Sequence, residues 1–335
     1  MLTKRKNFLE TIRGGKPDRF VNQYEYLSLL IGPNYALLDP INKAFPPLIP
    51  GGPAVTGAWG VTMEFQAGQP GPLPLHSEKY TVLKDIKKWK DTVKMPKTSY
   101  PDSAWEESAK IAAAVDRKET FAAVAYFTGV FERLHYLMGM EECMINFYEE
   151  PELMHELVDY ITEYELKYAE EVTKHWKPDA LFHHDDWGSR TSSFISPDMF
   201  SEFIKPAYMK IYGFYKSRGV EIIVHHSDSY AANLVPHMID MGIDVFQGCV
   251  DENNVPELVK KYGGKISFMG DLNNSKLDKA DWTRELVRTE VERACKENGK
   301  LYYIPCLTMG GPVSIYPGVY EAVTEEINLM SKKMF

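Results

Sequence analysis

The feature that most constrains this chain is a regular alternation of apolar and amphipathic segments from residue 120 onwards. Short apolar runs typical of buried strands each precede a helical stretch, and the helix predicted over 151–176 repeats apolar residues every three or four positions. The predicted strands are 121–129, 179–189, 220–229, 243–250, 265–273 and 300–307. Apolar strands that alternate with amphipathic helices indicate a parallel sheet covered by helices.

The N-terminal third is less regular. We expect a helix at 3–13, a strand at 20–26 and one further strand within 55–100, which brings the barrel strands to eight. The segment 32–74 is rich in Pro and Gly, and we expect an ordered loop with short strands packed on the body, with a lid over a site as the alternative. The order of strands and helices predicts one (β/α)8 TIM barrel over 1–335, with 1–100 as an N-terminal extension carrying elaborated loops.

An open doubly wound sheet is the alternative fold. Such sheets usually carry a Gly-rich dinucleotide loop after the first strand. Neither GxGxxG nor GxxxxGK[ST] occurs in this sequence. The barrel is therefore favoured.

Composition excludes several classes of protein. With 38 Lys+Arg against 47 Asp+Glu the net charge is −9, which argues against a nucleic-acid partner. An apolar share of 44% can form a full core, and no apolar run approaches the ~18 residues of a membrane span. The four cysteines form no CxxC pair, so we expect a reducing, cytoplasmic location.

Polar side chains follow the predicted strands at the ends that meet at one mouth of a barrel. These ends read HHDDWG from 183, HHSD from 225, QGC from 247, GD from 270 and PC from 305. Alternation along a strand turns only every second side chain inward. Either His183 with Asp185 or His184 with Asp186 faces the axis, and the same choice is open on the next strand.

Histidine and cysteine at one mouth favour a zinc site, in which three protein ligands leave one position open. We expect His225 and Cys306 as the first two ligands, with the third from an aspartate, a glutamate or His226. Cys143 and Cys295 lie on predicted helices and are expected to be structural. Cys249 lies at the end of a predicted strand and remains an alternative metal ligand.

The order of motifs resembles the uroporphyrinogen decarboxylase superfamily over nearly the whole chain. The likeness rests on RKNFLETIRGGKPDRF, GVFERLHYLMGMEECMINFYEEPELMHELVDYITEY, DDWG, GVEIIVHHSDS, MGIDVFQG, KYGGKISFMGDLN and IPCLTMGGPVSIYPGVYEAVTEEI. The resemblance implies a (β/α)8 barrel and two kinds of enzyme, decarboxylases and zinc-dependent methyltransferases that work with corrinoid proteins.

Two departures from the motifs of the superfamily indicate which of its enzymes this chain resembles most. Decarboxylases of the superfamily carry an RQAGR-like segment whose arginines hold substrate carboxylates, but this chain reads NQYEYLSLL there, with no arginine between Arg19 and Arg117. Thiol-directed methyltransferases carry HxCG, whereas Ser227 stands here at the Cys position after His225. The closest resemblance is to the methyltransferase I component of anaerobic aryl-ether O-demethylases.

This resemblance implies transfer of a methyl group from a methoxylated aromatic molecule to the cobalt(I) of a corrinoid (cobalamin) carried by a partner protein. His225 and Cys306 would bind zinc, and the expected acids or further ligands are Asp186, His226 and Asp228. The expected walls of the substrate pocket are Tyr24, Tyr26, Trp59, Trp187 and Phe246. The alternatives are a methylcobamide:thiol or folate methyltransferase, a uroporphyrinogen-type decarboxylase and a non-catalytic corrinoid- or tetrapyrrole-binding barrel. The sequence leaves the oligomeric state open, a homodimer included.

Overall fold

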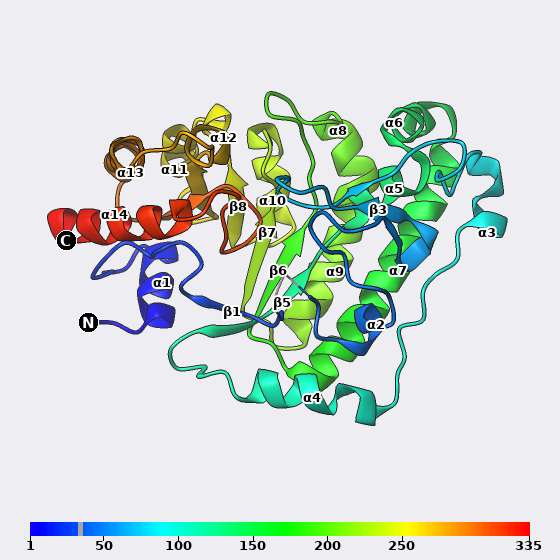
Figure 1. The fold of residues 1–335 in the computed structure, drawn as a ribbon, viewed down its shortest axis with the longest axis horizontal. Coiled ribbons are helices and arrows are strands. Elements are labelled where there is room, and N and C mark those ends of the chain that lie inside the picture. The colour runs from blue at the N-terminus through cyan, green and yellow to red at the C-terminus, as the bar shows by residue number, and fades with distance from the viewer. Residues whose placement is uncertain (33–35) are drawn as a thin grey trace.

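A curled parallel sheet forms the centre of the molecule (Figure 1). The computed structural model describes residues 1–32 and 36–335. The sheet runs in the order β1-β5-β6-β7-β8-β9-β10, and each neighbouring pair is parallel. Its strands are β1 (Leu27–Leu29), β5 (Phe121–Tyr126), β6 (Ala180–His184), β7 (Ile222–His226), β8 (Val245–Cys249), β9 (Ser267–Leu272) and β10 (Tyr303–Leu307). The predicted (β/α)8-type barrel is confirmed as the fold class.

Helices follow these strands and cover the outer face of the sheet, as Figure 1 shows. The longest is α7 (Pro151–Trp176), which begins with Pro at its first position, where a missing N–H costs nothing. The others are α1 (Lys4–Ile12), α2 (Pro40–Lys43), α3 (Trp89–Thr92), α4 (Asp102–Ala113), α5 (Val130–Met138), α6 (Met140–Glu149), α8 (Pro197–Met199), α9 (Lys205–Ser217), α10 (Val235–Asp240), α11 (Val255–Tyr262), α12 (Asn274–Leu277), α13 (Arg284–Asn298) and α14 (Val319–Met334).

Alternation along each strand divides the buried side chains into two cores. An inner core inside the barrel takes Ala123, Phe182, Val224 and Cys306 from four different strands, together with Phe8 of α1. The outer core, between sheet and helices, takes the intervening residues of the same strands. The parity of a residue on its strand therefore decides whether its side chain can reach the mouth.

The N-terminal third differs from the prediction in two respects. The first barrel strand is β1, and the predicted strand at 20–26 is wrong because those residues end in a turn. The predicted barrel strand within 55–100 is also wrong. The short strands expected within 32–74 are present instead, as a small antiparallel sheet of β2 (Val55–Thr56), β3 (Thr62–Glu64) and β4 (Leu73–Pro74), because Pro and Gly leave room only for very short strands.

Among the described residues, no backbone pairing joins the two edge strands β1 and β10. The side chain of Gln23 spans this seam, since its Oε1 accepts from the backbone N–H of Leu307 (3.3 Å). The Pro-rich segment 32–74 packs on the body through Ile41 and Trp59, both buried, as expected for an ordered loop. Residues 33–35 of that segment lie outside the described part of the chain.

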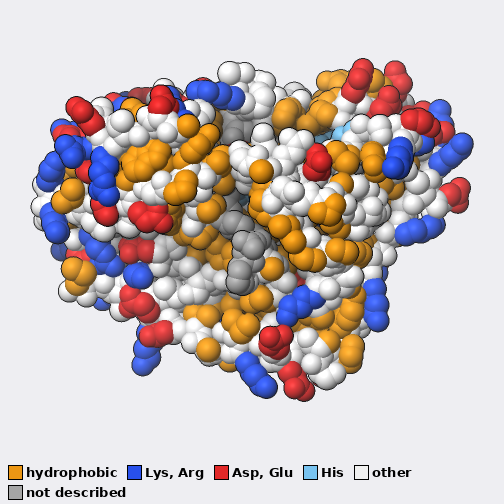
Figure 2. Space-filling model, in the orientation of Figure 1, with side chains coloured by type: hydrophobic (Ala, Val, Ile, Leu, Met, Phe, Trp, Pro, Cys, Tyr) orange, Lys and Arg blue, Asp and Glu red, His pale blue; other side chains and the backbone are white. Residues whose placement is uncertain are grey.

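The surface carries charges of both signs. Figure 2 shows Lys and Arg side chains interspersed with Asp and Glu on the face that it draws. All four cysteines are buried and free of disulfides. Within the described residues no helix is long and apolar enough to cross a membrane.

Candidate metal centre at the mouth of the barrel

The register of three neighbouring strands sets out the polar residues of the mouth in two rows. His184 pairs with His226 across β6 and β7, and His226 pairs with Gln247 across β7 and β8. His184 and His226 follow Phe182 and Val224 at a spacing of two, so they share the inner face. His183 and His225 form the other row, which faces the outer core.

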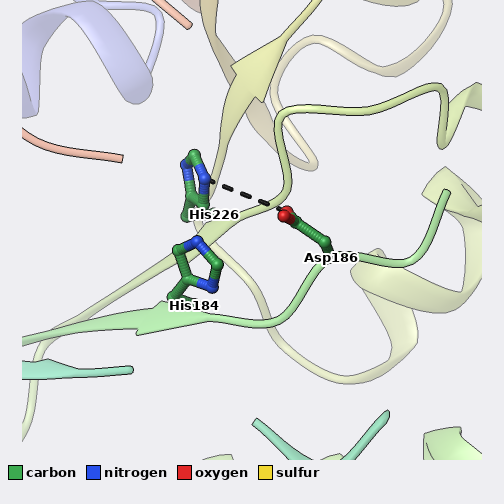
Figure 3. Close-up of side chains that lie close together, drawn as sticks. All are labelled: His184, Asp186 and His226. Carbon is green, nitrogen blue, oxygen red and sulfur yellow. Dashed lines mark ion pairs between the residues drawn. The ribbon is translucent and has the colours of Figure 1, made fainter. Parts of the chain in front are cut away.

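Three inward side chains converge in a group that we call the mouth cluster: His184, Asp186 and His226. Among the described residues, they can each offer one ligand atom, and these atoms lie within 4.8 Å of one another. The imidazole rings of His184 and His226 stack with centroids 4.4 Å apart, and His226 Nε2 lies 3.9 Å from Asp186 Oδ1 (Figure 3). Two imidazoles and a carboxylate match the ligand types of a catalytic zinc site.

Each histidine of the mouth cluster is oriented by an oxygen acceptor on its Nδ1. His184 Nδ1 lies 2.9 Å from Glu132 Oε2 of α5, and Tyr136 donates to the other oxygen of Glu132 (3.1 Å). His226 Nδ1 is hydrogen-bonded to Gln247 Oε1, and Gln247 Nε2 donates to Leu307 O (3.3 Å). These contacts leave Nε2 of both rings for a ligand, an arrangement that orients metal-binding histidines in proteins.

Charge and burial set the protonation of the mouth cluster. Burial lowers the pKa of His184, but the Glu132 and Asp186 carboxylates outweigh burial and raise it to about 10. Burial lowers the pKa of His226 to about 3, and it raises the pKa of Asp186 to about 6 against the charge of His184. At neutral pH His226 is therefore neutral, Asp186 is ionised and His184 is protonated, so a metal ion that binds to His184 would have to displace its proton.

The loop between β10 and α14 approaches the mouth cluster through Gly310. A Cβ added there would stand 3.0 Å from His226 Nε2 and 3.3 Å from His184 Cδ2. The loop is anchored beside this point, because Tyr24 donates its hydroxyl to Met309 O (2.7 Å) and Met309 N donates to Asn274 Oδ1 (2.9 Å). Any residue larger than glycine would therefore place its Cβ against His226 Nε2.

The structure does not bring the two expected ligands, His225 and Cys306, into the mouth cluster. His225 is fully buried in the outer row, with Nδ1 2.7 Å from the Tyr212 hydroxyl and Nε2 3.2 Å from Asp185 O. Its ring stacks on Trp187 at 3.7 Å, so both nitrogens and one face are already engaged. The sequence pattern left the phase of this strand open, and the register resolves it in favour of His226.

Cys306 faces the inner core, next to Gln247. Burial raises the pKa of its thiol, which keeps it protonated, although a hydrogen bond with Gln247 opposes the shift. Gln247 also bonds His226, so the Gln247 side chain lies between Cys306 and the mouth cluster.

The other expected site residues divide between the mouth and the cores. Asp228 is exposed at the rim, and its backbone N–H donates to Asp186 Oδ1 (3.2 Å). Tyr24 and Tyr26 belong to the inner core. Trp59, Trp187 and Phe246 are packed in the outer core, so the structure does not bring them to the mouth.

Sequence reasoning assigned no role to four residues around the mouth cluster, although it placed Gln247 at a polar strand end. Glu132 and Gln247 orient the histidines, whereas Phe127 and Phe182 flank them, with ring centroids 6.0 Å from His184 and 5.9 Å from His226 respectively. Phe127 directly follows β5, and in the sequence it stood out only as part of an apolar strand-type run. Glu132 lies 52 positions before His184, and no spacing pattern links the two.

Comparison with known proteins places the chain in a family. A family model described as uroporphyrinogen decarboxylase (URO-D) matches residues 54–328. The chain belongs to this family. The match covers most of the sequence and agrees with the resemblance inferred from its motifs.

A solved structure supports the fold of this URO-D family member. A methyltransferase from Methanosarcina mazei matches with a TM-score of 0.66 at 13% identity, over 98% of this chain and 99% of that one. A GH18 chitinase from Pseudoalteromonas aurantia matches at a TM-score of only 0.34 and 12% identity, over 69% of this chain and 82% of that one. No curated protein matches the sequence. At 13% identity the likeness to the methyltransferase is one of fold alone.

Proposed function

We propose that this chain is a zinc-dependent methyltransferase that moves a methyl group from a methoxylated aromatic molecule to the cobalt(I) of a corrinoid carried by a partner protein. The observation that carries the proposal is the mouth cluster, in which His184, Asp186 and His226 present ligand atoms within 4.8 Å of one another. The fold likeness to a methyltransferase supports the same class of reaction.

The residues present fit a zinc ion. His184 and His226 would bind through Nε2 because Nδ1 of each ring is already held by Glu132 or Gln247, and Asp186 would bind through its carboxylate. When bound, zinc supplies a Lewis acid that stabilises negative charge on an ether oxygen. A nitrogen and oxygen ligand set suits an oxygen substrate better than a thiol, which supports the ether reading over the thiol alternative.

The aromatic ring of the substrate would lie against Phe127, which flanks His184 and is only partly buried. Phe182 is completely buried and packs edge-on against Phe127, with ring centroids 6.5 Å apart, so it supports this wall from the inner core. Offset or edge-on contacts between aromatic rings contribute about 0.5–1.5 kcal/mol beyond area burial. This wall favours a methoxyarene over an aliphatic ether.

The proposed reaction balances as a displacement at the methyl carbon. The carbon–oxygen bond breaks with its electron pair on oxygen, and cobalt(I) supplies both electrons of the new cobalt–carbon bond. The phenolate oxygen then takes one proton. We assign this proton to Asp228, which lies at the open rim next to Asp186.

A panel assay tests the proposal. Zinc-loaded protein with free cob(I)alamin is expected to form methylcobalamin and the free phenol in equal amounts from methoxybenzoates or methoxyphenols. Carbon dioxide release from uroporphyrinogen without methylcobalamin would establish the decarboxylase alternative instead. Methylation of a thiol or folate by methylcobalamin as the sole activity would establish those alternatives, and no turnover on any substrate would favour a binding protein.

A further inference from the structure

Asp185 stands between two members of the mouth cluster in sequence, yet its side chain points the other way. It is completely buried. Its Oδ1 accepts from Glu132 N (2.7 Å), and its Oδ2 accepts from Phe131 N (3.0 Å) and Trp187 Nε1 (2.9 Å). The Tyr208 hydroxyl also donates to Oδ2. Every one of these partners is a donor, so the carboxylate serves as a four-fold acceptor.

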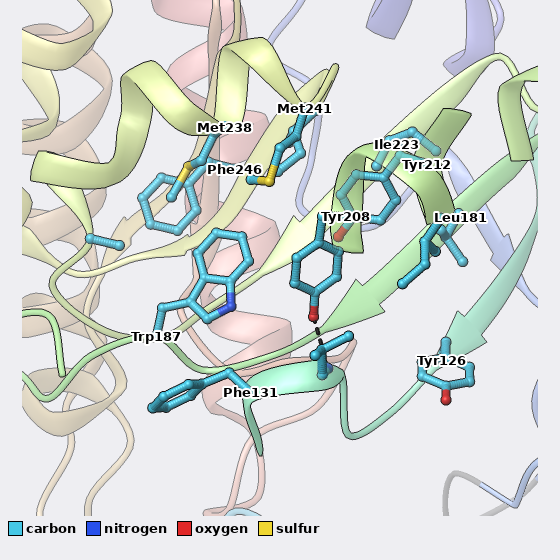
Figure 4. Packing of buried hydrophobic residues seen from close by; sticks show 14 of the residues in the cluster. Tyr126, Phe131, Leu181, Trp187, Tyr208, Tyr212, Ile223, Met238, Met241 and Phe246 are labelled. Atoms are coloured by element: carbon cyan, nitrogen blue, oxygen red, sulfur yellow. Dashed lines mark hydrogen bonds between the residues drawn. The ribbon is translucent and has the colours of Figure 1, made fainter. Parts of the chain in front are cut away.

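Two of those donors are the first-turn amides of α5. The Tyr208 hydroxyl accepts the preceding amide, Val130 N (3.0 Å), and Figure 4 shows Tyr208 and Trp187 packed above the start of this helix beside Phe131. Three N–H groups that an α-helix leaves unpaired at its N-terminus are therefore satisfied by Asp185 and Tyr208. The N-cap residue of α5 is Gly129, which has no side chain to do this.

The junction between β6 and α5 is tight. Gly129 N donates to His184 O (2.8 Å), and a Cβ on Gly129 would stand 2.6 Å from Asp185 Cβ and 2.4 Å from the Tyr208 hydroxyl. The start of α5 thus rests directly on the end of β6. The Asp185 carboxylate therefore joins the first turn of α5 to the end of the strand that carries His184.

We infer that Asp185 is a positioning residue that fixes Glu132 at the start of α5 and, through Glu132, the ring of His184. Asp185 holds the Glu132 backbone, and the Glu132 carboxylate holds His184 Nδ1 at 2.9 Å. In this way one DDWG segment, residues 185–188, supplies both a member of the mouth cluster and the anchor that orients another. The inference rests on the proposed function, because it assumes that the mouth cluster binds a metal.

Cobalt(II) binding to the metal-depleted full-length chain tests this. Asp185→Asn places an amide NH2 against N–H donors, so cobalt(II) affinity should fall by about 10–100-fold with a changed d–d spectrum, as for other outer partners of metal ligands. Glu132→Gln should give a similar loss. The double variant should lose little more than either single variant, because both act through one contact. Hydrogen exchange in the first turn of α5 should accelerate in Asp185→Asn but not in Glu132→Gln.

The outcomes separate the two levels of the account. Asp198→Asn, an exposed substitution on α8, is the matched control and should bind cobalt(II) as the wild type does. A wild type that binds no cobalt(II) or zinc would overturn the proposed metal site and this inference with it. A wild type that binds, with Asp185→Asn within two-fold of it or additive with Glu132→Gln, would overturn the inference alone. If Asp185→Asn does not fold, Tyr208→Phe replaces it: a smaller loss in the same direction supports the inference, and unchanged affinity and spectrum contradict it.

Discussion

Replacing His226 by alanine is expected to lower zinc affinity by more than about 100-fold and methyl transfer by at least about 1000-fold. Loss of an outer partner of a metal ligand costs about 10–100-fold in affinity, so loss of a ligand should cost more. Metal-assisted stabilisation of developing charge contributes several kcal/mol, and about 4 kcal/mol corresponds to a thousand-fold in rate. Zinc competition with a chromophoric chelator and methylcobalamin formation measure the two effects.

The neighbouring histidine is the matched control. His225→Phe keeps a ring against Trp187 but removes the bonds to Tyr212 and Asp185, so it should lower stability by about 1–3 kcal/mol while zinc affinity stays within a few-fold. His226 is almost fully buried, so its replacement by alanine also affects stability. His184→Ala is the second test of the same effect on zinc affinity, because the His184 side chain is 22% exposed. Zinc loss in His225→Phe with normal zinc binding in His226→Ala and His184→Ala would restore His225 as the ligand.

Replacing Gly310 by alanine is the second change with a large expected effect. The new Cβ would lie 3.0 Å from His226 Nε2, on the atom that the proposed metal requires. Relief requires the loop or the ring to shift, and such overpacking costs about 1–3 kcal/mol. We expect zinc affinity to fall by at least about 10-fold and methyl transfer to fall at least as far, while the unfolding temperature falls by only a few degrees.

Gly71→Ala provides the control for this change, because a Cβ at Gly71 meets nothing within 4 Å. Both variants should show the same circular dichroism as the wild type. Full zinc affinity in Gly310→Ala would mean that the loop moves clear of the histidines when the metal binds, and the role assigned to Gly310 would then be wrong.

The barrel could be predicted because its signal is local. Each strand from β5 to β10 is a short apolar run followed by an amphipathic helix, and the parallel sheet follows from that order. The N-terminal third could not be predicted in the same way. Its Pro- and Gly-rich sequence is compatible with short strands in either sheet. Only tertiary contacts assign β2, β3 and β4 to a sheet separate from the barrel.

The site could be predicted only as far as its location. The polar strand ends pointed to the mouth, but the choice between His225 and His226 depends on strand phase, which adjacent histidines do not reveal. Gln247 was among the polar strand ends, but its bond to His226 depends on the register of neighbouring strands. Glu132 could not be found, because it reaches His184 across the fold rather than along the chain. Asp185 shows most clearly what the sequence does not reveal. It is next to Asp186 in the chain, yet its side chain points away from the mouth and accepts hydrogen bonds from the first turn of α5.

The most direct test of the account is a zinc titration of the metal-depleted protein during methyl transfer from a methoxyarene to cob(I)alamin. We predict no turnover without zinc, a linear rise in rate, and saturation at about one zinc per chain, as expected for a single site with three protein ligands. The His184→Ala and His226→Ala variants should stay inactive at the zinc concentration that saturates the wild type. Full turnover in the absence of metal, or a zinc response that survives both substitutions, would contradict the assignment of the mouth cluster as the catalytic metal site.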